Sequence, residues 1–259
     1  MSSPEEDYVA VSLYGGGGVV LYPINADGSL GAPTDSRFYT GGSNVVPASQ
    51  NAPHLHSTTW VPGTSLVLAA DLGNDQIVQF KLDRSSKKFN SGSLPIVKRP
   101  PGSGPRHMDI HPNGNIAYVV DELSNTIGVY QLNAQDKSLP SQATQVISTL
   151  PVGNTKASSS ADIHVSGDGR FVYSSNRGHD SIAIFRVTSQ TTGALQFVGT
   201  QSIRGTVPRS FLLYKNYLIV AGQNSDTIEV FLRNDDGTLT NTGITASSPT
   251  PVSLFIPAV

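Results

Sequence analysis

Four copies of one short pattern occupy most of this chain and limit the folds that it can adopt. Each copy is a short apolar strand, a polar turn and a second strand that ends in an aromatic residue. The turns with their second strands span residues 71–80, 121–130, 176–185 and 222–231, and a compressed copy spans residues 13–22. Equivalent residues in successive copies lie 46 to 58 residues apart. A repeat of this length, made of short strands, predicts the blades of a β-propeller.

The third repeat shows how one blade is built. Apolar alternation predicts strands at residues 161–165, 170–174, 181–187 and 195–198, separated by tight polar turns. Four antiparallel strands joined in this way make one propeller blade. We therefore predict an all-β chain that forms a single β-propeller domain over residues 1–259.

The two ends of the chain carry parts of one further blade. Residues 8–13 and 19–22 have the pattern of the second and third strands of a repeat, but no first strand precedes them. Residues 251–256 resemble residues 208–213, which form a first strand, but no second strand follows them. Pairing the two ends would cover two exposed sheet edges. We expect a composite closing blade built from both termini, and five blades in all.

Composition narrows the kinds of partner. The formal net charge is −2, 14% of residues are charged and no run of Lys or Arg is present, so nucleic acid is not an expected partner. The apolar stretches have only strand length and the first seven residues are acidic, so we expect no membrane partner and a cytoplasmic location. Cysteine is absent, which removes thiol chemistry and disulfides. We expect no cofactor and no metal ion, because close ligand spacing occurs only at His54 and His56.

Propeller geometry predicts a candidate site at one mouth of the ring. The start of the first strand and the end of the second strand of each blade lie on the same face, close to the axis. These positions predict four catalytic residues from three successive repeats, namely His56, Arg106, Glu122 and Arg177. Around them we expect six substrate-binding side chains, those of His54, His107, Asn176, His179, Arg209 and Gln223.

A structural role competes with several of these assignments. Arg106 and Arg177 have the spacing to form salt bridges with Glu122 or Asp121 across neighbouring blades, although one carboxylate does not need two arginines for that purpose. The position of His107 is typical of a packing residue, and that of His179 suits either a substrate contact or a hydrogen bond between blades. Aspartates that recur in nearly every turn are typical of structural caps, and these are Asp75, Asp180 and Asp226.

Short motifs distributed over nearly the whole chain point to one family. They are YGGGG at residues 14–18, ADGSL at 26–30, PHLH at 53–56, GPRH at 104–107, VDELS at 120–124 and SNRGHDS at 175–181. Together they resemble the lactonase-type β-propellers, which include 6-phosphogluconolactonase and the fungal 3-carboxymuconate lactonizing enzyme. The resemblance implies a seven-bladed ring, about two blades more than this chain carries. It also implies catalytic roles at the same four positions that the blade geometry selects.

The chemistry open to these side chains is narrow. Guanidinium groups bind carboxylate or phosphate oxygens bidentately and stay charged, so Arg106 and Arg177 are expected to hold a small anionic substrate. Glu122 or His56 would serve as general base for a water molecule that attacks a lactone carbonyl. With the resemblance, this predicts a hydrolase that opens an anionic sugar lactone. A cycloisomerase that forms a lactone from 3-carboxymuconate is the alternative, and a non-catalytic interaction propeller is a third hypothesis.

Overall fold

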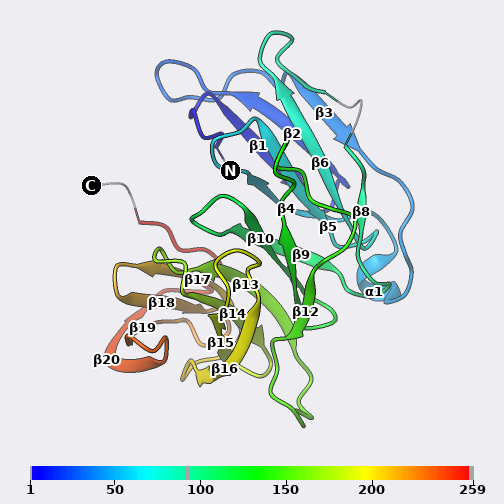
Figure 1. The fold of residues 1–259 in the computed structure, drawn as a ribbon. Helices are drawn as coiled ribbons and strands as arrows, with labels where there is room; N and C mark the ends of the chain where they lie inside the picture. The colour runs from blue at the N-terminus through cyan, green and yellow to red at the C-terminus, as the bar shows by residue number, and fades with distance from the viewer. Residues whose placement is uncertain (1, 91–93, 257–259) are drawn as a thin grey trace.

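The computed structural model describes residues 2–90 and 94–256, which form five antiparallel sheets in chain order (Figure 1). We call these sheets blades 1 to 5. Blade 1 contains β1 (Tyr8–Leu13), β2 (Gly18–Pro23) and β3 (Asp35–Phe38). A four-residue helix, α1 (Pro47–Gln50), leads to blade 2, which contains β4 (Leu55–Trp60), β5 (Leu66–Asp71), β6 (Gln76–Asp83), β7 (Lys88–Asn90) and β8 (Val97–Lys98).

The other three blades have four strands each. Blade 3 contains β9 (Pro105–Ile110), β10 (Ile116–Asp121), β11 (Thr126–Gln131) and β12 (Gln145–Ser148). Blade 4 contains β13 (Ser159–Val165), β14 (Phe171–Arg177), β15 (Ser181–Val187) and β16 (Leu195–Ser202). Blade 5 contains β17 (Pro208–Tyr214), β18 (Tyr217–Gly222), β19 (Thr227–Arg233) and β20 (Leu239–Ser247). The prediction of an all-β propeller is confirmed. No helix in the part of the chain that the structure describes is long and apolar enough to cross a membrane.

The apolar core lies between neighbouring blades. Blades 2 and 3, for example, enclose a cluster that includes Leu68, Ile77, Val119 and Tyr130. Similar clusters lie between blades 1 and 2, between blades 3 and 4 and between blades 4 and 5. Because each sheet packs against the next, the innermost strands β4, β9, β13 and β17 follow one another around a common centre.

A buried ion pair also joins blades 2 and 3. The Nε atom of Arg99 donates to Asp121 Oδ1 at 3.0 Å, and a second guanidinium nitrogen contacts the other carboxylate oxygen. Thr126 Oγ1 donates to the same carboxylate at 2.8 Å, and Arg99 donates to the Tyr130 hydroxyl at 3.0 Å. Both charged side chains are almost completely buried. Since a buried charge is tolerated only with its partner, the two residues depend on each other.

Asp75 links blade 2 to blade 3 and Asp180 links blade 4 to blade 5, which confirms the predicted structural role of the turn aspartates. Asp75, Asp180 and Asp226 all have positive φ, which aspartate tolerates better than most residues. The Asp75 carboxylate accepts hydrogen bonds from the N–H groups of Gly102 and Gly104, both at 2.7 Å, just before β9. Asp180 accepts from the Val207 N–H at 2.8 Å, just before β17. The turn of one blade therefore fixes the start of the inner strand of the next blade.

The predicted composite closing blade is wrong. Blade 1 has three strands, and residues 251–256 form no strand and do not pair with β1 (Figure 1). Instead, the Thr250 N–H donates to Asp226 at 2.8 Å, as the Val207 N–H does to Asp180. Thr250 and Val207 both have positive φ and both precede a proline. The C-terminal segment thus leaves blade 5 where the inner strand of a following blade would begin, which holds it away from blade 1.

Candidate functional site

One side chain from each of the five blades lines a cavity of about 450 Å³, which we call the mouth. Its lining residues are Tyr14, His56, Glu122, Arg177 and Arg209. Equivalent positions in the repeats supply them, because His56 and Arg209 are the second residues of their inner strands. Arg177 ends the second strand of blade 4, and Tyr14 and Glu122 directly follow the second strands of blades 1 and 3. The structure thus brings four of the ten predicted site residues together at the mouth, namely His56, Glu122, Arg177 and Arg209.

Glu122 lies between two arginines. Its Oε2 atom is 2.8 Å from Arg106 Nε, and its Oε1 atom is 3.0 Å from Arg177 Nη2. The salt bridges that a structural role of the two arginines predicts are thus present. The Glu122 side chain is 18% exposed, so the carboxylate still reaches the mouth. A carboxylate has about four acceptor sites, and two ion pairs leave capacity for a water molecule.

Arg106 lies beneath the mouth and does not line it, contrary to the prediction. Its side chain is 2% exposed, and it donates from Nη1 to the Ala161 carbonyl. Burial lowers the pKa of Arg106 to about 10, against the opposing effect of Glu122. Arg106 is well placed to orient Glu122 and to add positive charge below it. The arginines that line the mouth itself are Arg177 and Arg209.

Arg209 differs from the other two arginines. Arg177 donates to the Ser160 carbonyl at 3.1 Å in addition to its ion pair, whereas Arg209 forms no hydrogen bond or ion pair within the described residues. Its guanidinium group is therefore available to a ligand. Together with Arg106 and Arg177 it gives three positive charges against the one negative charge of Glu122.

His56 is a neutral member of the wall. Burial lowers its pKa to about 2, and Arg106, His107 and Arg209 add to the effect. Its Nδ1 atom is buried without a hydrogen-bond partner in the described part of the chain. The imidazole thus carries no charge at neutral pH and is a weak proton acceptor while the mouth is empty.

Tyr14 is the mouth residue that the sequence-based site prediction left out. Its ring stacks on His54 with centroids 4.3 Å apart and meets His56 edge to face at 5.4 Å. The Nδ1–H group of His54 also donates to the Tyr14 carbonyl oxygen at 2.9 Å, so His54 supports the rim from behind Tyr14. The repeat spacing did place Tyr14 in line with Glu122 and Arg177. That spacing was the signal that could have identified it.

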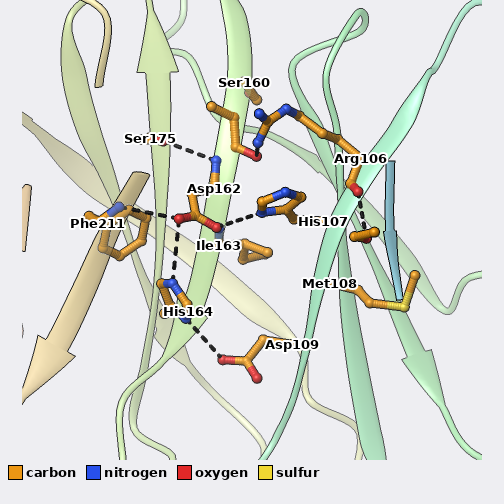
Figure 2. A network of polar contacts seen from close by, with 12 residues as sticks. Arg106, His107, Met108, Asp109, Ser160, Asp162, Ile163, His164, Ser175 and Phe211 are labelled. Carbon is orange, nitrogen blue, oxygen red and sulfur yellow. Dashed lines mark hydrogen bonds and ion pairs between the residues drawn. The ribbon is translucent and has the colours of Figure 1, made fainter. Parts of the chain in front are cut away.

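His107 faces a second cavity, of about 250 Å³, and not the mouth. Its Nδ1 atom is 2.8 Å from Asp162 Oδ1, and Asp162 also lies 3.6 Å from His164 Nε2 (Figure 2). The other nitrogen of His164 lies 3.7 Å from Asp109. His107 is thus part of a polar network that joins β9 and β13. His56 separates this network from the mouth, with its ring 5.1 Å from that of His107.

The network fixes the charges of its members. Burial would lower the pKa of His164, but Asp162 and Asp109 raise it to about 10. Burial would raise the pKa of Asp162, but His164 and His107 hold it well below its usual range. Burial lowers the pKa of His107, so this ring is neutral. The network therefore holds an imidazolium, that of His164, between the carboxylates of Asp162 and Asp109.

This arrangement predicts a pH dependence of stability. The raised pKa of His164 stabilises the fold fully below its unfolded value of 6.5, and this contribution is lost as pH rises toward about 10. The free energy of unfolding, measured by urea denaturation across that range, should fall in the parent protein and fall less in His164→Gln. His179→Gln is the matched control, because the hydrogen bond of that histidine, to Ser181, lies within its own turn. An equal fall in the parent and in His164→Gln would contradict the prediction.

The remaining three predicted residues do not reach the mouth. Asn176 is completely buried, where it donates to the Thr149 carbonyl at 2.9 Å and accepts from Ser160 Oγ at 3.0 Å. His179 bonds to Ser181 Oγ at 2.7 Å within its own turn. Gln223 uses its backbone N–H to bond the Val207 carbonyl, and its side chain is not among those that line the mouth. Position within a repeat placed these residues near the axis, but local hydrogen bonds hold the side chains of Asn176 and His179 elsewhere.

No group of three or more His, Cys, Asp or Glu side chains in residues 2–90 and 94–256 is arranged to hold a metal ion. Glu122 is instead paired with Arg106 and Arg177, and Asp162 with His107 and His164. What the mouth offers is a positively charged concave surface with one carboxylate, one neutral imidazole and one aromatic ring. Such a surface fits a small anion with a polar ring.

Comparison with known proteins agrees with this description. A family model described as "Lactonase, 7-bladed beta-propeller" matches residues 1–256. The 6-phosphogluconolactonase of Bacillus subtilis is 36% identical over 251 residues, which cover 96% of this chain and 69% of that protein. A protein of Formosa agariphila with the same name is 33% identical, over 88% of this chain and 64% of its own length.

Solved structures give the same result. The periplasmic gluconolactonase PpgL of Pseudomonas aeruginosa superposes with a TM-score of 0.90 at 31% identity, over 98% of this chain and 71% of that one. A putative 6-phosphogluconolactonase of Bacteroides fragilis superposes with a TM-score of 0.86 at 32% identity, over 95% and 69% of the two chains. The five blades thus keep the arrangement that they have in longer propellers, which explains why they do not close into a smaller ring.

Proposed function

This chain belongs to the lactonase family of seven-bladed β-propellers, and from that membership we propose that its mouth hydrolyses an anionic sugar lactone of the 6-phosphogluconolactone class. The observation that carries the proposal is the excess of positive charge around the cavity of about 450 Å³. Three arginines surround a single carboxylate, and Arg209 has no partner within the described residues. A phosphate or carboxylate on the substrate would supply that partner.

Binding would begin at Arg209. Its guanidinium group binds the anionic group of the substrate, and the exposed ring of Tyr14 packs against the apolar face of the sugar ring. The negative charge of the substrate offsets the arginines that lower the pKa of His56. The pKa of His56 therefore rises on binding, which makes the imidazole a better hydrogen-bond acceptor for a substrate hydroxyl.

Glu122 would act as the general base in the chemical step. It takes a proton from a water molecule, and the resulting hydroxide attacks the lactone carbonyl carbon. Arg177 lies 3.0 Å from Glu122 and stabilises the negative charge that develops on the carbonyl oxygen. The ester C–O bond then breaks, and the leaving oxygen takes the proton back from Glu122. The product is the open-chain hydroxy acid.

The direct test is an activity screen of the purified chain. We expect hydrolysis of 6-phosphogluconolactone, followed as acid release at constant pH and corrected for spontaneous opening. Conversion of 3-carboxymuconate in place of lactone opening would favour the cycloisomerase. Failure to act on any lactone, with the fold intact by circular dichroism, would favour an interaction propeller.

Arg209 provides a test of substrate capture. Replacing it with glutamine should raise KM by about 10- to 100-fold with little change in kcat, because a charge-assisted contact contributes about 1.5–3 kcal/mol. Arg209→Lys should retain part of the affinity, since it keeps the charge but not the planar fork. Arg204→Gln is the control, because Arg204 is exposed and does not line the mouth. An unchanged KM in Arg209→Gln would remove Arg209 from the site.

A further inference from the structure

The inner strands of blades 2 to 5 share an irregularity that the sequence pattern does not show. In blade 2, Leu55 and Ser57 of β4 pair with two consecutive residues of β5, so the ladder passes over His56. The ladders of blades 3 and 5 pass over Arg106 and Arg209 in the same way. Such a β-bulge leaves one residue unpaired and turns its side chain in a new direction. The bulge is therefore the backbone feature that directs these three side chains toward the site.

Blade 4 has its bulge at Ala161 and Asp162, which lie opposite the single residue Ser175 of β14. The Asp162 N–H donates to the hydroxyl oxygen of Ser175 at 3.0 Å (Figure 2). The equivalent residues of blades 2, 3 and 5 carry no hydroxyl group, and they are Ala70, Val120 and Ala221. A side-chain acceptor for the bulge is thus particular to blade 4 among these blades.

The bulge of blade 4 also binds the two arginines that flank Glu122. The Ser160 carbonyl accepts from Arg177 Nη2 at 3.1 Å, and the next carbonyl, that of Ala161, accepts from Arg106 Nη1. Consecutive carbonyls of a regular strand point toward opposite edges of the sheet, so a β13 without the bulge would direct only one of them toward the site. The Ser160 N–H donates to the Glu122 carbonyl at 3.1 Å as well. One short stretch of β13 thus contacts Glu122 and both of its arginine partners.

The Asp162 carboxylate fastens the bulge to the blades on either side. It accepts from the Phe211 N–H of blade 5 at 3.2 Å and lies 2.8 Å from His107 Nδ1 of blade 3 (Figure 2). It also accepts from the N–H of Ile163 at 3.1 Å. The side chain of Asp162 is therefore held by both neighbouring blades, while its backbone N–H is held by Ser175.

We propose that Ser175 is a positioning residue of the mouth, which acts through the bulge of blade 4 on Arg106 and Arg177. Ser175 itself does not line the cavity. Without its hydroxyl group the buried N–H of Asp162 loses an acceptor, and a buried donor without an acceptor is costly. The backbone then relaxes toward a regular ladder, which turns the Ala161 carbonyl away from Arg106.

The kinetic consequence rests on the proposed lactonase function. Arg106 and Arg177 orient Glu122 and stabilise the developing negative charge, so their displacement should lower kcat. Arg209 lies on the separate bulge of blade 5, so capture of the anionic group should be little affected. A loss of turnover without a loss of affinity therefore distinguishes Ser175 from a residue that binds the substrate.

Two adjacent serines on β14 allow a matched test. Ser174 and Ser175 are both completely buried, and Ser174 Oγ has no hydrogen-bond partner in the described part of the chain. Ser175→Ala should lower kcat on 6-phosphogluconolactone by about tenfold or more, since a displacement of about 1 Å in a site can cost on the order of 10²-fold. KM should stay close to the parent value. Ser174→Ala should retain the parent kcat, and Ser175→Thr, which keeps the hydroxyl group, should retain most of it. Equal kcat in the two alanine variants, or an equal loss in Ser175→Thr and Ser175→Ala, would overturn the proposal.

A second measurement does not depend on catalysis. The Nε–H groups of arginines give separate NMR signals in isotope-labelled protein, and the signal that disappears in Arg106→Lys is that of Arg106. This signal should shift in Ser175→Ala and stay in place in Ser174→Ala. An unmoved signal in Ser175→Ala would overturn the positioning role even if the chain is an active lactonase. A shifted signal in a chain that opens no lactone would support the positioning role and contradict the proposed function.

Discussion

Replacing Glu122 with glutamine is expected to lower turnover of an anionic lactone by a factor of about 10² to 10⁴. Glutamine keeps the shape of the side chain but cannot accept the proton of the attacking water. The variant also leaves Arg106 and Arg177 without their carboxylate partner, so the thermal midpoint must be measured beside kcat and KM. Loss of kcat at a temperature where the variant remains folded would assign the base to Glu122.

Two further variants test whether Glu122 or His56 is the general base. Glu122→Asp keeps the charge but withdraws it by one methylene group, so we expect an intermediate loss of turnover. His56→Gln should raise KM more than it lowers kcat, because the low pKa of His56 makes it the weaker proton acceptor. If His56→Gln alone abolishes turnover while Glu122→Gln retains it, histidine is the base and Glu122 an orienting group.

The largest expected effect on stability comes from Asp121→Ala. This change leaves the buried guanidinium of Arg99 without its carboxylate, which is expected to lower the free energy of unfolding by about 3–5 kcal/mol. Urea denaturation of the two proteins at one pH measures the difference. The double variant Arg99→Met/Asp121→Leu removes both charges and should recover much of the loss. A cost below about 1 kcal/mol, as for an exposed pair, would contradict the burial of this ion pair.

Much of the fold could be predicted from the sequence because the repeat imposes two independent periods. Alternation within each strand identifies the buried face, and the spacing of 46 to 58 residues identifies the blade. The prediction for residues 181–187 agrees with the observed β15 at both ends. The closing blade could not be predicted in the same way. Sequence similarity between residues 251–256 and β17 identifies a strand type, but the packing between blades decides which edge the strand can reach.

The candidate site was predicted only in part for a related reason. Equivalence within the repeat locates a side chain near the axis, which was sufficient for His56, Glu122, Arg177 and Arg209. This equivalence does not show whether a residue close in space forms a hydrogen bond with that side chain and holds it away from the mouth. Asn176 satisfies buried groups of blade 4 and the segment before it. Such hydrogen bonds depend on distances between segments of the folded chain, which the linear sequence does not contain.

The links between turn aspartates and the following inner strands bear on how the protein folds and how it evolves. Each link joins residues only 24 to 29 positions apart, as between Asp226 and Thr250 or between Asp75 and Gly104. A link of this kind can form as soon as two consecutive blades have emerged from the ribosome, before distant parts of the chain have been synthesised. It also makes each blade a transferable unit, because the turn aspartate that binds the next inner strand belongs to the blade itself. Duplication or loss of a repeat then changes the number of blades without changing the contacts between neighbouring blades.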